Sequence, residues 1–95
     1  MITRHVVIAN RLGLHARAAA RLVNVARQYV SHVRLERPDT GKTADGKGIL
    51  GVLLLTASRG TELVVSAEGS DAEAAVAALC KLIERRFEEE GDGLF

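Results

Sequence analysis

The sequence predicts an α+β fold, an open-faced β-sandwich in which a four-stranded antiparallel sheet carries three helices on one face. Segments with the two-residue alternation of strands and segments with the three-to-four-residue spacing of helices follow one another in the order β-α-β-β-α-β-α. Strands separated by a helix, then by a turn, then by another helix indicate two interleaved split βαβ units. The length of 95 residues suits a single domain.

The first strand and the first helix are predicted from short β-branched and amphipathic segments. Residues 3–9 are β-branched and place Val6 and Ile8 on one face of a strand. A turn over residues 10–13 then leads into a helix over about residues 16–29. Its apolar side chains recur every three or four residues and form one stripe: Ala19, Leu22, Val23, Ala26 and Val30.

A hairpin follows the first helix. Residues 32–37 alternate between apolar and polar side chains, as a half-buried strand does. Pro38 presets φ and Gly41 tolerates a positive φ, so residues 38–41 predict a turn. A short strand over residues 42–44 completes the hairpin.

The last three elements are a short apolar helix over residues 49–55, a strand over residues 61–67 and a helix over residues 72–87. Ser70 and Glu73 have the spacing of a capping box, which predicts Ser70 as the N-cap of the last helix. The residues after 88 mix acids with glycines and are expected to form a flexible tail over residues 89–95.

Composition excludes several classes of function. Three aromatic residues are too few for a base-stacking nucleic-acid module, and a net charge of +1 provides no strong field toward nucleic acid or membranes. The single cysteine excludes an intrachain disulfide and is expected to be a small buried hydrophobe. Neither a secretion signal nor an apolar run of membrane-spanning length is visible, so we expect a cytoplasmic protein without membrane insertion. No residue pattern predicts a metal site or a cofactor.

One histidine stands out because it begins the first helix, in the run Gly13-Leu14-His15-Ala16-Arg17. The first N–H groups of a helix have no intrahelical partner and, together with the helix dipole, attract anions. A neutral imidazole there is a nucleophile that can accept a phosphoryl group, and Arg17 is a planar donor suited to phosphate. The residues alone leave open the simpler alternative of a solvated histidine at a helix start.

The helix over residues 49–55 is apolar nearly all round, more than one core-facing stripe requires. Either the helix is wedged beneath neighbouring loops, or Leu50, Leu53 and Leu54 contribute to an exposed patch that binds a partner. The nearby run Gly46-Lys47-Gly48 lacks the spacing of a phosphate-binding P-loop.

Three motifs together resemble HPr, the histidine-containing phosphocarrier family of the bacterial phosphoenolpyruvate-dependent phosphotransferase system. They are Gly13-Leu14-His15-Ala16-Arg17, Gly46-Lys47-Gly48-Ile49-Leu50-Gly51-Val52, and Ala67-Glu68-Gly69-Ser70-Asp71 with Glu73 and Ala74. The resemblance runs from about Val6 to Phe87, which implies an HPr-like domain over residues 1–88. The β-α-β-β-α-β-α order is also the fold of that family.

The resemblance implies that enzyme I phosphorylates His15 at Nδ1 and that an EIIA-type protein then receives the phosphoryl group. It further implies that Arg17 and the backbone N–H groups of Ala16 and Ala18 hold this group. The chain would then be a monomeric covalent relay, not an independent enzyme and without a cofactor. The implied partner interface consists of Ala20, Arg27, Ile49, Leu50, Leu53 and Leu54.

The chain departs from the family pattern at two positions. Ala18 stands where the family usually has proline, which restores one backbone N–H. Gly48 stands where many members have a serine that a regulatory kinase phosphorylates, so that control cannot operate here. The run from His15 to Ala19 resembles nitrogen-branch members, which pass phosphate to regulatory proteins. The alternative function is a regulatory module of the same fold that binds partners without turning phosphate over.

Overall fold

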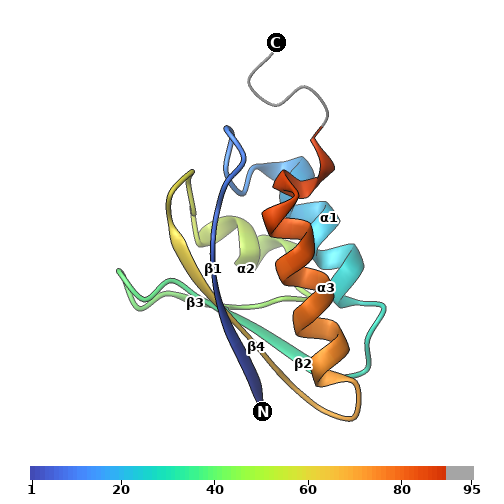
Figure 1. The fold of residues 1–95 in the computed structure, drawn as a ribbon. Coiled ribbons are helices and arrows are strands. Elements are labelled where there is room, and N and C mark those ends of the chain that lie inside the picture. Colours follow the sequence, from blue (N-terminus) through green and yellow to red (C-terminus); the bar gives the residue numbers. More distant parts are fainter. Residues whose placement is uncertain (90–95) are drawn as a thin grey trace.

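The computed structural model describes residues 1–89, and the predicted order of elements is confirmed (Figure 1). Residues 90–95, most of the expected tail, lie outside the described residues. One short 3₁₀ helix, η1, is added at the end. The elements are β1 (Ile2–Val7), α1 (Ala16–Ala26), β2 (His32–Glu36), β3 (Thr43–Asp45), α2 (Ile49–Leu54), β4 (Glu62–Glu68), α3 (Ala72–Glu84) and η1 (Arg86–Glu88).

The four strands form one antiparallel sheet in the order β1-β4-β2-β3. Leu63, Val65 and Ala67 alternate along β4 and are all buried, whereas the side chains between them are partly exposed. One face of the sheet therefore forms the floor of the core. The helices α1 and α3 lie side by side on that face (Figure 1), as the sequence predicts.

The helix α1 ends at Ala26, three residues before the predicted end. Gln28 and Tyr29 donate their N–H groups to carbonyls only three residues back, at 3.0 and 3.2 Å, so the helix tightens and stops. Val30 is 76% exposed, and its assignment to the apolar stripe was wrong. The cause is Asp71, whose carboxylate accepts the N–H of Val30 at 2.9 Å and that of Ser31 at 3.0 Å.

The predicted capping box is wrong, because the N-cap of α3 is Asp71 and not Ser70. The Asp71 side chain does not cap its own helix but binds the chain that leaves α1. Hydrogen bonds from the Ser31 hydroxyl and from the Val30 N–H hold the pKa of Asp71 below its ordinary value. The contact between Ser31 and Asp71, which are 40 residues apart, thus fixes where α1 ends and where α3 begins.

The helix α3 ends at Glu84, short of the predicted residue 87. The three residues that follow Arg85 have left-handed backbone conformations, with φ of 58° at Arg86, 56° at Phe87 and 56° at Glu88. Such a run of residues other than glycine is strained, at about 1–2 kcal/mol for each residue. Phe87 is nevertheless fully buried. The left-handed turn therefore directs Phe87 into the core and turns the chain toward the start of α1.

Candidate functional site

The site begins with the tight turn before α1. Gly13 has a φ of +67°, and a Cβ at this position would lie 2.6 Å from the Ala57 carbonyl oxygen. The next residue, Leu14, donates its N–H to that same carbonyl at 2.9 Å. Only glycine permits this conformation and this close approach of two backbone segments. The turn thus fixes the direction in which α1 starts.

His15 is the N-cap of α1, with φ −73° and ψ 177°, and its side chain makes no capping hydrogen bond. The helical ladder begins with the Ala19 N–H, which donates to the His15 carbonyl at 2.8 Å. The N–H groups of Ala16, Arg17 and Ala18 precede this ladder, and the first turn holds no acidic side chain. This end of α1 therefore has the free donors and the dipole that favour an anion.

The residues expected to bind phosphate are not equally accessible. Ala16 and Arg17 are exposed, and the Arg17 side chain forms no hydrogen bond or ion pair with residues 1–89. Ala18, in contrast, is fully buried. An anion that approaches from solvent therefore meets Arg17 and the Ala16 amide, whereas the Ala18 amide lies beneath the surface.

The His15 ring faces a partner that the sequence did not indicate. Its Nε2 lies within hydrogen-bond distance of Oε1 of Glu89, and the two side chains are 27% and 10% exposed. Asn10, which is fully buried, donates from Nδ2 to the Gly13 carbonyl at 2.8 Å and to Glu89 Oε1 at 3.3 Å. The Asn10 Oδ1 has no hydrogen-bond partner among the described residues. The Glu89 carboxylate therefore contacts both the His15 ring and Asn10, which belongs to the turn before α1.

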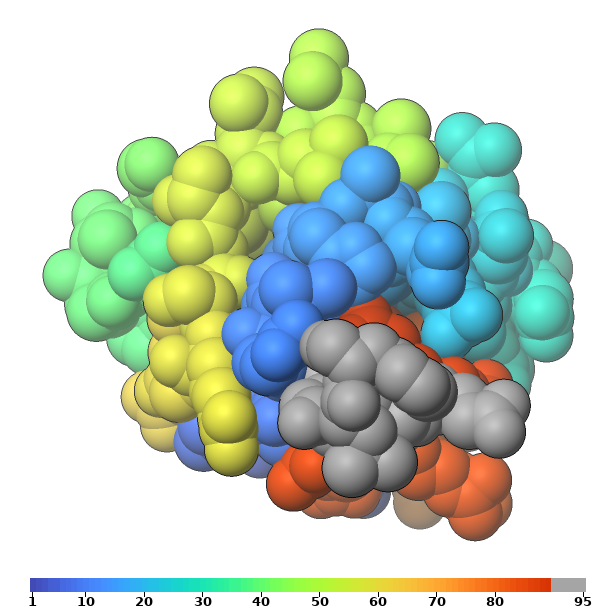
Figure 2. Space-filling view, turned by 90° about the horizontal axis from the view of Figure 1, so that it is seen from above, coloured from blue at the N-terminus to red at the C-terminus, as the bar shows by residue number. Residues whose placement is uncertain are grey.

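The chain brings Glu89 to this place through η1. Phe87 anchors the segment in the core, and the Arg21 guanidinium of α1 donates to the Phe87 carbonyl. Figure 2 shows the resulting surface, in which the blue start of α1 lies between α2 in yellow-green and the red residues that end α3. In the sequence, the one sign that this segment returns to the start of α1 is an aromatic residue, Phe87, directly before the acidic tail.

The helix α2 lies beside α1 and presents the apolar surface that its composition suggested. Ile49, Leu50 and Leu54 are 44%, 67% and 61% exposed, and we call these three residues the α2 patch. Leu53 is half-buried and packs against the core.

Of the two other residues of the expected interface, one lies on α1 and the other directly after it. Ala20 is partly exposed, and the exposed Arg27 follows the C-terminal end of the helix. The Arg27 Nε donates to the Lys47 carbonyl at 3.1 Å, and Lys47 Nζ donates to the Tyr29 carbonyl at 2.7 Å. These bonds link the end of α1 to the loop that starts α2.

Other reactive side chains lie away from this site. Cys80 is buried as predicted, and burial raises the pKa of its thiol, which keeps it protonated. His5 pairs with Glu62 at 3.2 Å on the exposed face of the sheet. Within residues 1–89 no cluster of ligands suited to a metal occurs, and none of the helices there is long and apolar enough to span a membrane.

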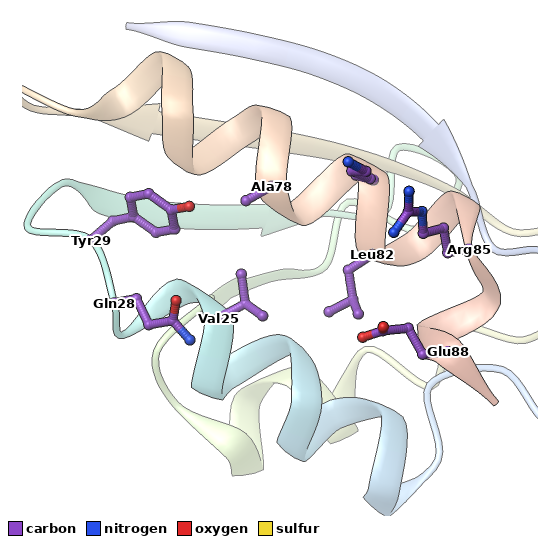
Figure 3. A pocket seen from close by; sticks show the side chains of 8 residues that line it. Val25, Gln28, Tyr29, Ala78, Leu82, Arg85 and Glu88 are labelled. Atoms are coloured by element: carbon purple, nitrogen blue, oxygen red, sulfur yellow. The ribbon is translucent and has the colours of Figure 1, made fainter. Parts of the chain in front are cut away.

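An open groove of about 260 Å³ separates α1 from α3 (Figure 3). Val25 and Leu82 form its apolar floor, and Tyr29, Arg85 and Glu88 stand around it. The lining includes neither His15 nor any member of the α2 patch. The groove is therefore separate from the histidine site.

Known proteins resemble this chain over nearly its full length. The family model described as "PTS HPr component phosphorylation site" matches residues 2–85. The phosphocarrier protein HPr of Cupriavidus necator is 42% identical over 94% of this chain and 98% of its own length. The phosphocarrier protein NPr of Shewanella violacea is 35% identical over 93% and 94%. The crystal structure of HPr from Thermoanaerobacter tengcongensis superimposes with a TM-score of 0.88, at 40% identity over 95% of this chain and 99% of that one.

Proposed function

The chain belongs to the HPr family of phosphocarrier proteins of the phosphotransferase system, and on that premise we propose that His15 carries the phosphoryl group. Enzyme I delivers the group to Nδ1 of His15, and an EIIA-type protein removes it. The chain acts as a relay, because it holds the group covalently between two partners and converts no substrate of its own. We place this activity in the cytoplasm and assign it to the monomer.

One observation carries the proposal, namely that His15 caps a helix whose first turn is free to bind an anion. The ring stays 27% exposed, so a partner protein reaches it directly. Arg17 is exposed two residues later and brings a permanent positive charge to the same helix end. The helix N-terminus then stabilises the negative charge that phosphorylation adds.

The test is phosphoryl transfer from labelled phosphoenolpyruvate in the presence of enzyme I. We expect one label for each chain, labile in acid and stable in alkali, which is absent from His15→Ala. The matched controls are His5→Ala and His32→Ala, because both residues are exposed on the sheet and lie outside the site. A label that persists in His15→Ala, or that never forms in the wild type, would refute the proposal.

The partner surface combines the helix end with the α2 patch. Arg17 is exposed on α1 and Arg27 is exposed directly after it, and the apolar patch lies beside this helix on α2. This arrangement suits partners with an acidic rim around an apolar centre, because rim charges accelerate encounter and apolar contacts then hold the complex. Ala20 and the partly exposed Leu53 complete the proposed interface.

The downstream branch is a finer proposal. The sequence around His15 favours an acceptor that regulates nitrogen metabolism over one that transports sugars, and matches include proteins named both HPr and NPr. Gly48, the N-cap of α2, has no hydroxyl, so we propose that kinase control at this position is absent. A regulatory module that uses the same surface without phosphoryl turnover would bind its partner equally well as wild type and as His15→Ala.

A further inference from the structure

The Glu89 carboxylate is nearly enclosed beside the reactive ring. Its side chain is only 10% exposed, and Oε1 lies against two nitrogens, Nε2 of His15 and Nδ2 of Asn10. The family match ends at residue 85, so Glu89 belongs to a part of the chain that the family's phosphorylation-site model does not include. The contact therefore lies outside the region that the phosphorylation-site model matches.

The backbone is strained in order to bring Glu89 there. Three consecutive residues other than glycine, from Arg86 to Glu88, are left-handed. Strain of this kind persists only when surrounding contacts hold it, and it is concentrated at functional sites. Here the buried Phe87 ring and the Arg21 bond to the Phe87 carbonyl supply those contacts. The next residue after the strained turn is Glu89.

We infer that Glu89 is a positioning residue, which holds His15 in the tautomer whose Nδ1 carries the free electron pair. An ionised carboxylate only accepts hydrogen bonds, so Nε2 of His15 must be the protonated nitrogen. The Asn10 amide donates to the same oxygen and fixes the carboxylate in turn. Nδ1 makes no hydrogen bond with residues 1–89 and is left as the nucleophile. This inference rests on the proposed function of His15.

The transfer step balances without a proton acceptor at Nδ1. The Nδ1 electron pair forms the new P–N bond while the bond between phosphorus and the donor breaks, and that electron pair leaves with the donor. The ring becomes a cation that keeps its Nε2–H, and the Glu89 carboxylate stabilises it, as the aspartate of a catalytic triad stabilises an imidazolium. When the acceptor takes the phosphoryl group, the P–N electron pair returns to Nδ1.

The experiment compares Glu89→Ala with Glu88→Ala by NMR at about pH 8, where an ordinary imidazole is neutral. Glu88 is the matched control because it is adjacent and acidic but stands at the groove of Figure 3. In the wild type and in Glu88→Ala we expect a slowly exchanging Nε2–H proton of His15, which is lost in Glu89→Ala. A purely structural role of residue 89 would not remove this signal while leaving the remaining spectrum unchanged.

The second measurement is the rate of His15 phosphorylation, with enzyme I and phosphoenolpyruvate and, separately, with the small donor phosphoramidate. We expect Glu89→Ala to react about tenfold to a hundredfold more slowly with both donors, the range for one hydrogen bond to a charged group. Unchanged rates, a retained Nε2–H signal or equal losses in Glu88→Ala would overturn the inference. A wild type that accepts phosphate from neither donor would overturn the proposed function itself, whatever the NMR signal shows.

Discussion

The helices α1 and α2 lie side by side, and neither has a side chain that caps its start. At α1 the N-cap is His15, whose ring turns away from its own helix toward Glu89. At α2 the N-cap is Gly48, which has no side chain at all. Relative to a serine or aspartate cap, a cap without a side-chain acceptor costs about 1 kcal/mol of helix stability, and a glycine cap costs a few tenths of a kcal/mol. The fold tolerates this loss in two helices that pack against each other.

The difference between the two starts lies in what surrounds them. The start of α1 is fixed by a glycine turn, a buried asparagine and a buried phenylalanine, so its donors and its histidine have defined positions. The start of α2 leads into exposed apolar side chains that are held on one side only. The first region thus suits the chemistry proposed at one atom, and the second suits the contact proposed over an area.

The largest predicted effect comes from Gly13→Ala, which would break the fixed start of α1. The new Cβ would lie 2.6 Å from the Ala57 carbonyl oxygen in a backbone of φ +67°, so we expect a loss of about 2–4 kcal/mol in unfolding free energy. Denaturant unfolding measures it. The control is Gly60→Ala, with φ +90° but no atom within 4 Å of the added Cβ. Equal losses in the two variants would show that the close contact with residue 57 is unimportant.

The second prediction sharpens the role of the α2 patch. Leu50 is 67% exposed, so Leu50→Asp should leave the unfolding free energy within about 0.5 kcal/mol of the wild type. The affinity for enzyme I should fall about tenfold or more, since a charge replaces an apolar contact. Calorimetric titration measures the affinity. Val30→Asp is the control, because Val30 is 76% exposed outside the patch, and an equal fall there would contradict the assignment.

The third prediction concerns the start of α3, which differs from the starts of α1 and α2 because its N-cap residue, Asp71, has a carboxylate. Bonds from Ser31 and Val30 lower the folded-state pKa of Asp71, so its contribution to stability is present above the unfolded value of about 3.9 and is lost as the pH falls through the folded value. Asp71→Ala should therefore melt below the wild type near pH 7, and the two melting temperatures should converge in acid. A difference that stays constant down to about pH 2 would contradict this.

The smallest effect is expected from Gly48→Ser, which would make the two helix starts less alike. The nearest atom to the new Cβ is the Asp45 carbonyl oxygen at 3.8 Å, an ordinary contact. A serine hydroxyl can accept a free N–H of the first turn, so we expect stability to rise by a few tenths of a kcal/mol. Thermal unfolding checks the direction. A clear decrease would mean that the α2 start needs the freedom of glycine.

The parts of this molecule that the sequence predicted are those with local causes. His15 and Arg17 stand two residues apart in one turn, and the apolar excess of α2 is visible in six consecutive residues, so neighbouring residues alone predict both features. The end of α1 could not be predicted in this way, because it depends on a carboxylate 40 residues away. Glu89 is the extreme case. It contacts His15, which lies 74 residues earlier in the sequence. The left-handed turn that makes this contact possible contains no glycine, so the sequence does not indicate it.

The position of Glu89 also has a practical consequence for anyone who handles this protein. The described chain ends next to the His15 ring, whereas the N-terminus lies at the opposite end of the molecule (Figure 1). An affinity tag or a reporter fused after residue 95 would be joined only six residues beyond Glu89, where enzyme I is proposed to dock. Purification tags and fluorescent labels should therefore be attached before Met1.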